Sequence, residues 1–232
     1  MRANCEQVLT EEQLREAGFT PLEEVQSTDI SMMSPETIQN MEDFCNRVLW
    51  IDDDIDQQTN GMVMRHIIQW NRDDQDVPVE QRQPIYLFIN SNGGEMSAAF
   101  ALYNSIITSK TPVFGINMSY AFSAAFIVLL GCTRRFGMPY SAYMMHSGSS
   151  ESYSVGYKAA FNGVKHWGWQ VRDMVDIVRS RTKITQDDAE RYIQTDTYFD
   201  ASDAYKLGII DEIVVSIEDL LQAKVDEEIV EE

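Results

Sequence analysis

The sequence predicts an α/β protein with a largely parallel sheet. Between residues 47 and 148, short apolar runs alternate with longer amphipathic runs, each followed by polar or glycine-containing turns. This order is typical of strand–helix–strand crossovers, which bring successive strands into a sheet in parallel. With 232 residues, 44% of them hydrophobic, the chain is long enough to bury a full core in one compact domain.

Strands and helices are expected to alternate along the chain. The short runs are rich in Val, Ile, Phe and Tyr, and the longer ones carry apolar residues at helical spacing. In order, the segments are a strand at 47–51, a helix at 60–73, a strand at 84–90, a helix at 96–109, a strand at 112–118, a helix at 123–132 and a strand at 141–148.

A polar, serine-rich stretch then leads into a long helix predicted at 157–181. Its apolar residues recur at three and four residue spacing and form one stripe. The stripe comprises Phe161, Val164, Trp167, Val171, Met174, Val175 and Val178. The apolar side chains of such a stripe need to be buried against another surface. That surface is either the helix's own domain or a second subunit, and the sequence leaves both possibilities open.

The two ends of the chain differ in amino-acid composition from the middle. Residues 1–45 are polar and predict an N-terminal appendage, in which Ser34 as N-cap and Pro35 as first helical residue mark a helix start. Residues 46–217 form the predicted main domain. Residues 218–232 are an acidic tail.

Composition disfavours several classes of partner and location. Eighteen basic and 37 acidic residues give a net charge of −19, which repels nucleic acid and anionic lipid. Three cysteines without CxxC spacing suggest neither a disulfide framework nor a zinc site, and no metal site is expected. The lack of a continuous apolar segment at the N-terminus, or of one long enough to cross a membrane, favours a cytoplasmic protein.

Ser123 is a candidate nucleophile. It lies between an expected strand and an expected helix, in the apolar stretch "GINMSYAFSAAFIVLLGC". A hydroxyl at such a turn faces the free N–H groups of the helix start, which attract an anion. A serine there is more often a simple N-cap, so the position alone leaves both roles open.

Two further segments carry groups suited to the same chemistry. The paired glycines of "FINSNGGEMSAA" can turn backbone N–H groups toward a ligand, although an ordinary turn is equally compatible. His146 ends an apolar strand, where parallel sheets place their sites, and a neutral imidazole there can accept a proton from serine. His66 and His166 are better explained as packing or surface groups.

Four segments in register resemble the proteolytic subunit of the Clp protease. They are "PIYLFINSNGG", "SYAFSAA", "AYMMHS" and "TDTYFDASDAYKLGIIDEIV", and the similarity covers about residues 47–215. The resemblance implies the fold that this family shares with crotonases, with repeated ββα units, a compact head and a protruding helical handle. The chain departs from the family's motifs at Asn92, Ser119 and Phe122, so we regard it as a divergent member.

The resemblance also implies roles for particular residues. Ser123 matches the family's nucleophile, His146 its general base and Asp196 its acid. The backbone N–H groups of Gly94 and Ala124 match the oxyanion hole. In a second, weaker match, Tyr86 and Phe88 correspond to aromatic residues that receive the partner unfoldase, although a core role is equally compatible.

The implied function is ATP-dependent serine endopeptidase activity on unfolded polypeptides within an oligomeric chamber. The expected assembly is a heptameric ring fed by an AAA+ unfoldase. Stacking of two rings into a tetradecamer is left open, because Thr197 replaces the arginine that couples the rings in the family. No cofactor is expected. Because this chain has no P-loop motif, ATP would be used only by the partner ATPase.

Three other functions remain open at this point. A catalytically weak scaffold subunit would have the fold without the activity. A phage-type capsid maturation peptidase would use the same fold, and the unusual leader leaves room for it. A crotonase-like acyl-CoA hydratase would use the paired N–H groups alone.

Overall fold

The computed structural model describes residues 34–149 and 156–222, and the chain divides into two units, Met1–Val48 and Leu49–Glu232. In the first unit, helix α2 (Pro35–Cys45) begins where the sequence predicts. Ser34 is its N-cap and accepts a hydrogen bond of 3.1 Å from the backbone N–H of Thr37. Cys45 is disulfide-bonded, which the cysteine spacing did not lead us to expect.

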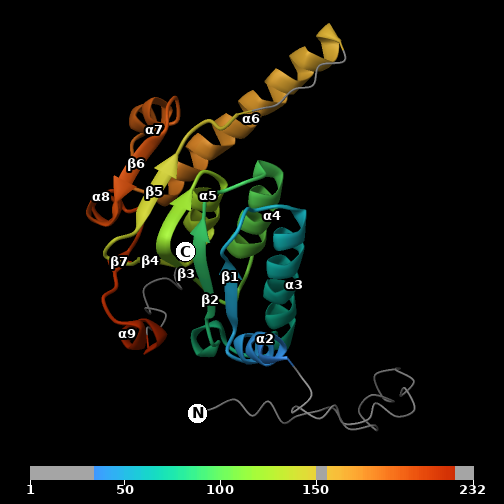
Figure 1. The fold of residues 1–232 in the computed structure, drawn as a ribbon, viewed down its shortest axis with the longest axis vertical. Coiled ribbons are helices and arrows are strands. Elements are labelled where there is room, and N and C mark those ends of the chain that lie inside the picture. Colours follow the sequence, from blue (N-terminus) through green and yellow to red (C-terminus); the bar gives the residue numbers. More distant parts are fainter. Residues whose placement is uncertain (1–33, 150–155, 223–232) are drawn as a thin grey trace. The chain divides into compact units, whose positions relative to one another are not determined.

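The second unit is built on a seven-stranded sheet (Figure 1). Its strands are β1 (Val48–Ile51), β2 (Ile85–Ser91), β3 (Val113–Phe122), β4 (Arg134–Gly137), β5 (Ala142–Met145), β6 (Thr197–Asp200) and β7 (Glu212–Ile213). The main path runs β1-β2-β3-β4-β7, and β5 joins β3 to β6 off this path. The pairs from β2 to β7, and β3 with β5, are parallel, whereas β5 and β6 are antiparallel.

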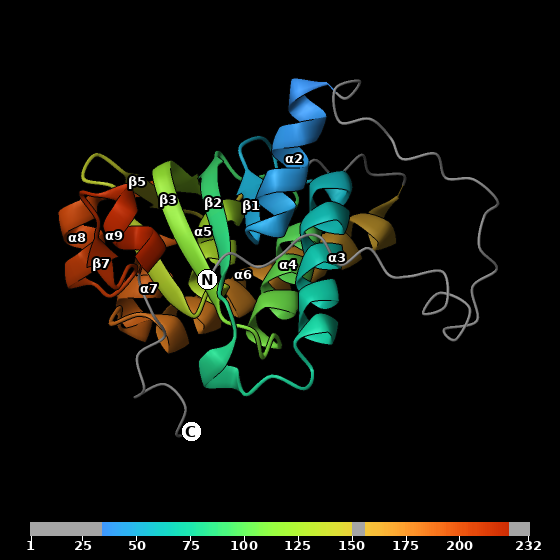
Figure 2. The ribbon, with the colours of Figure 1, turned by 90° about the horizontal axis from the view of Figure 1, so that it is seen from below.

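The helices of this unit connect the strands. They are α3 (Gln57–Asp73), α4 (Met96–Ile107), α5 (Ala124–Gly131), α6 (Tyr157–Arg181), α7 (Gln186–Tyr192), α8 (Ala201–Lys206) and α9 (Ile217–Gln222), with a short 3₁₀ helix at Val79–Gln81. Figure 2 shows α3, α4 and α5 side by side along one face of β1, β2 and β3. The α/β class with a mainly parallel sheet is therefore confirmed.

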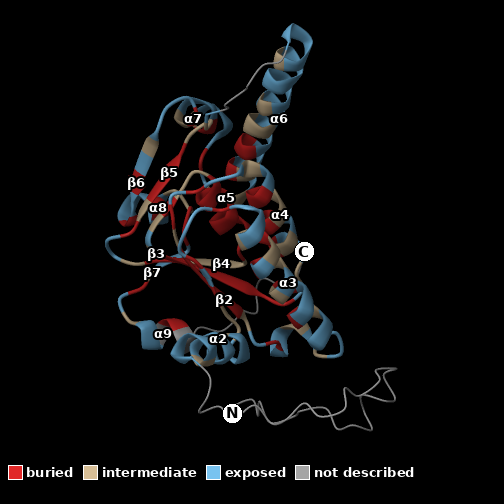
Figure 3. Ribbon diagram, turned by 45° about the vertical axis from the view of Figure 1, so that its right-hand side comes forward, coloured by how far each residue is buried: buried red, intermediate tan, exposed pale blue. Residues whose placement is uncertain are grey.

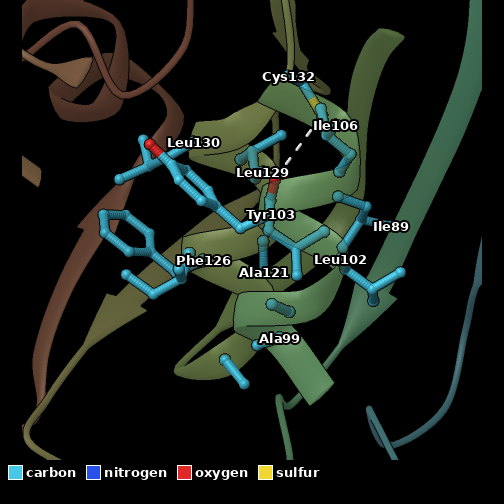
Figure 4. Close-up of a cluster of buried hydrophobic side chains, with 14 of the residues drawn as sticks. Ile89, Ala99, Leu102, Tyr103, Ile106, Ala121, Phe126, Leu129, Leu130 and Cys132 are labelled. Carbon is cyan, nitrogen blue, oxygen red and sulfur yellow. Dashed lines mark hydrogen bonds between the residues drawn. The ribbon is translucent and has the colours of Figure 1, made fainter. Parts of the chain in front are cut away.

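Helix α5 lies at the centre of the core. All eight of its residues are buried, and Figure 4 shows it packed on α4 through Leu102, Tyr103 and Ile106. Gly115 of β3 lets this helix approach closely, because a Cβ there would lie 2.6 Å from the Cys132 sulfur. The helix that follows Ser123 is thus fixed on every side.

Helix α6 has the predicted bounds but is unevenly buried. Its buried residues are Met174, Val175 and Val178, in the second half, while Tyr157 and Phe161 near its start are 88% and 60% exposed. In Figure 3 the first half extends away from the sheet with mostly exposed residues. The domain covers one half of the predicted stripe and leaves the other half exposed.

Strand β3 is longer than predicted and changes neighbours along its length. Its first half pairs with β4, from Phe114 to Asn117, and its second half pairs with β5, from Tyr120 to Phe122. The chain then turns at Ser123 into α5. Within the described part of the chain, no helix combines the length and hydrophobicity that a bilayer span requires.

Candidate active site

Ser123, His146 and Asp196 come from the ends of three neighbouring strands. Ser123 follows β3, His146 follows β5, and Asp196 precedes β6. Because β5 runs parallel to β3 and antiparallel to β6, the end of β3, the end of β5 and the start of β6 lie at the same edge of the sheet. The topology therefore brings together three residues that are remote in sequence.

The three side chains form a continuous hydrogen-bonded row. His146 Nε2 lies 2.7 Å from Ser123 Oγ, and His146 Nδ1 lies 2.9 Å from Asp196 Oδ1. The imidazole is 26% exposed and the carboxylate 59% exposed. Because the acid is well solvated, its main contribution to the row is to orient the ring by accepting the Nδ1–H hydrogen bond.

The backbone of Ser123 is held in an unfavourable conformation. Its φ is +53°, a left-handed value that is uncommon for residues other than glycine. A hydrogen bond of 2.8 Å from its N–H to the Met144 carbonyl keeps the turn against β5. The side chain makes no capping hydrogen bond to α5, so the hydroxyl is directed to His146 instead of acting as an N-cap.

The paired glycines pack directly against this turn. Gly93 and Gly94 have φ values of +109° and +142°, and a Cβ on Gly93 would lie 2.8 Å from the Ser123 Cβ. Ile55 fixes the pair from the other side: its N–H donates to the Gly93 carbonyl, and its carbonyl accepts from the Glu95 N–H, both at 2.7 Å.

The N–H groups of Gly94 and Ala124 make no hydrogen bond to any described residue. Gly94 lines the same cleft as Ser123, and Ala124 is the first residue of α5, directly after Ser123. Two free N–H donors beside a nucleophile are what an oxyanion hole requires. The role of these two N–H groups as an oxyanion hole stays a prediction from the family resemblance.

Gly94→Ala is expected to destabilise the protein by at least about 2 kcal/mol, because φ is unfavourable and the new Cβ meets the Ile55 backbone. The matched control is Gly61→Ala in α3, where a Cβ meets nothing within 4 Å. The control should stabilise the helix by up to about 1 kcal/mol. Urea unfolding of both variants measures the difference, and equal midpoints would contradict the packing described.

A cleft of about 1020 Å³ opens beside the row. Apart from Ser123 and His146, its lining is largely polar: Asp54, Ile55, Asp56, Asn92, Gly94, Glu95, Met96, Ser97, Met144, Ser147, Gly148, Ser149, His166, Trp167, Gln170 and Met174. None of these described lining residues is lysine or arginine. The pKa of Asp56 is lowered, chiefly by the hydrogen bond from the Thr59 backbone N–H, so this wall of the cleft carries negative charge at neutral pH.

Some lining residues were not singled out as site residues from the sequence. His166, interpreted there as a packing or surface group, is exposed and borders the cleft together with Trp167 and Gln170 of α6. Helical periodicity identifies the buried stripe but not which residue faces a cleft formed by another segment. His66 fits the earlier interpretation, because it stacks on Trp70 and burial lowers its pKa.

The two aromatic residues matched to partner binding lie within β2. Tyr86 and Phe88 are both only 7% exposed, which favours the core role left open above. Tyr86 meets Phe114 edge to face, and Phe88 stacks on Trp50 at 4.6 Å. Trp50, 41% exposed, is the member of this aromatic group that reaches the surface. In the described ranges, no three His, Cys, Asp or Glu residues gather as a metal-binding group.

A hydroxyl, an imidazole and a carboxylate in one hydrogen-bonded row form the arrangement of a serine hydrolase. The family model described as "Clp protease" matches residues 34–216. The chain belongs to the Clp protease family, and thus to a family of peptidases.

Individual relatives agree with this membership. The chain is 29% identical over 140 residues to "ATP-dependent Clp protease proteolytic subunit 2" of Treponema denticola, covering 60% of this chain and 70% of that protein. It is 26% identical over 172 residues to the "ATP-dependent Clp protease proteolytic subunit" of Chlorella vulgaris, covering 73% and 82%. A ClpP1 mutant from Listeria monocytogenes has the same fold, with a TM-score of 0.67, 20% identity, and coverage of 78% and 99%.

Proposed function

We propose that the protein is a serine endopeptidase that hydrolyses unfolded polypeptides. The observation that carries the proposal is the pair of hydrogen bonds that joins Ser123, His146 and Asp196. Family membership supports the peptide bond as the substrate, and the cleft of about 1020 Å³ has room for several residues of an extended chain.

In the proposed mechanism His146 acts first as base and then as acid. Nε2 takes the proton of the Ser123 hydroxyl while Oγ attacks the carbonyl carbon of the scissile bond. The Gly94 and Ala124 N–H groups donate to the oxygen that becomes negative. The imidazolium then gives its proton to the leaving amine, and an acyl-enzyme remains on Oγ.

Water completes the cycle by the same route. His146 takes a proton from a water molecule, which attacks the acyl carbon, and the proton returns to Oγ as the acid product leaves. Asp196 keeps the Nδ1 proton in place throughout, so that Nε2 is always the atom facing Ser123. No step needs a metal or cofactor bound to this chain.

The proposal includes assembly into a closed chamber with a partner ATPase. Members of the family whose names include "ATP-dependent" support the use of ATP by a partner. The exposed start of α6, with Tyr157, Phe161 and Val164 at 60% exposure or more, supports association with other subunits. A heptameric ring, alone or stacked in pairs, fed by an AAA+ unfoldase in the cytoplasm, is the assembly that we propose.

Reaction with a fluorophosphonate tests the chemistry, because this probe modifies only an activated serine. Mass spectrometry of the native protein should show one adduct, located at Ser123, and prior unfolding should prevent it. An assembled protein that takes up no label would overturn the proposal and favour the scaffold or hydratase alternatives.

A further inference from the structure

His146 is the first residue after the end of β5, so hydrogen bonds of the sheet do not fix its backbone. The last pairs of β5 are Phe122 with Met144 on one side and Met145 with Thr197 on the other. His146 therefore follows the final ladder position, and Ser147, Gly148 and Ser149 continue as irregular chain with a left-handed Gly148 at φ +73°. Another contact has to fix this backbone if the imidazole is to stay on Ser123.

Trp167 of α6 supplies such a contact. Its indole Nε1–H donates a hydrogen bond of 2.8 Å to the carbonyl of Ser147, the residue that follows His146 directly. Trp167 is half-buried and lies at the point where α6 passes from its exposed first half to its buried second half. An indole has one donor and a rigid ring, so this hydrogen bond holds the carbonyl in a defined direction.

The other end of α6 is fixed to the helix that carries the nucleophile. Arg181, the last residue of α6, donates from Nε to the Leu130 carbonyl and from Nη2 to the Cys132 carbonyl, both at 2.8 Å. Both carbonyls lie at the end of α5, whose first residue follows Ser123. Between these anchors, Met174, Val175 and Val178 are buried in the core.

The part of α6 between Trp167 and Arg181 is about 21 Å long. It forms a rigid connection between the end of α5 and the loop that follows His146. We propose that Trp167 is a positioning residue that holds the His146 imidazole in line with Ser123 through the Ser147 carbonyl. This inference rests on the proposed function, because positioning matters only if the row is catalytic.

The experiment compares Trp167→Phe with Trp169→Phe. Phenylalanine keeps an aromatic ring at position 167 but removes the N–H donor. Trp169 is the matched control, since it lies on the same helix, is 48% exposed, does not line the cleft, and contacts only His166 and Lys165 in the ring interactions of the described residues. Thermal unfolding establishes that both variants are folded.

The main readout is the kinetics of fluorophosphonate labelling at Ser123, separated into the maximal rate and the half-saturating concentration. In Trp167→Phe we expect the maximal rate to fall by about 10- to 100-fold, because a small misplacement of a catalytic group has a large effect on rate. The half-saturating concentration should change less than about twofold. The Trp169→Phe protein should resemble the wild type in both.

Amide hydrogen exchange gives a readout that does not depend on activity. Loss of the tether should let the last pair of the β5–β6 ladder, Met145 with Thr197, fray, which speeds amide exchange at this pair in Trp167→Phe and leaves it unchanged in Trp169→Phe. Normal labelling and normal exchange in Trp167→Phe would overturn the positioning role while leaving the proposed function intact. Wild-type protein that fails to label at Ser123 would overturn both.

Discussion

Replacing Ser123 with alanine is expected to lower the rate of peptide hydrolysis by on the order of 10⁴-fold or more, because no other group in the row can form the acyl-enzyme. Ser123 does not cap α5, so the loss of its hydroxyl removes no hydrogen bond on which the helix depends. Stability and assembly should therefore be close to those of the wild type. Hydrolysis of a fluorogenic peptide tests the expected loss of rate. Native mass spectrometry tests whether assembly is unchanged.

The matched control for this variant is Ser119→Ala. Ser119 lies in the same strand, β3, but its side chain is exposed and does not line the cleft. Its activity should stay within about twofold of the wild type, as expected for a surface substitution. A Ser123→Ala protein that kept most of its activity would show that the nucleophile has been assigned to the wrong residue.

Asp196→Asn is expected to lower the maximal rate by about 10³- to 10⁴-fold with little effect on substrate affinity. The asparagine amide can donate to His146 Nδ1, which favours the tautomer with its proton on Nε2. That tautomer cannot accept the Ser123 proton. Since the carboxylate is 59% exposed, we attribute this effect to the tautomer and not to the loss of a buried charge.

The control is Asp187→Asn in α7, where an exposed aspartate lies near the start of the helix. It removes the same charge from the same end of the chain, and its activity should be unchanged. If the two variants were equally active over pH 6 to 9, Asp196 would have no part in the reaction, and the row would end at His146.

The main elements of the fold could be predicted from the sequence because their signals are local. Long helices with a regular apolar stripe, such as α6, and buried strands such as β2 are specified by residues close together in the chain. The strands β4, β6 and β7 were not predicted, because their sequences RRFG, TYFD and EI include charged residues and lack the apolar run that marks the equally short β1 and β5. They form by pairing with strands that are far away in sequence.

The candidate site was predicted in a different way. Ser123, His146 and Asp196 were proposed together only because four segments resemble one family, since the aspartates around Asp196 are alike in composition. The hydrogen-bonded row now gives a geometric reason for the same choice. The contact between Trp167 and Ser147 could not have been predicted, because the helical pattern that identifies Trp167 as apolar says nothing of its single polar atom.

The complete burial of α5 has a consequence for how activity can be lost. Ser123 is joined to a helix that cannot shift without opening the core, whereas Asp196 lies in an exposed turn between α7 and β6. Mild heat or denaturant should therefore break the hydrogen bond between Asp196 and His146 first and leave Ser123 in place. Inactivation of this kind would be reversible, since the scaffold needed to rebuild the row would remain folded.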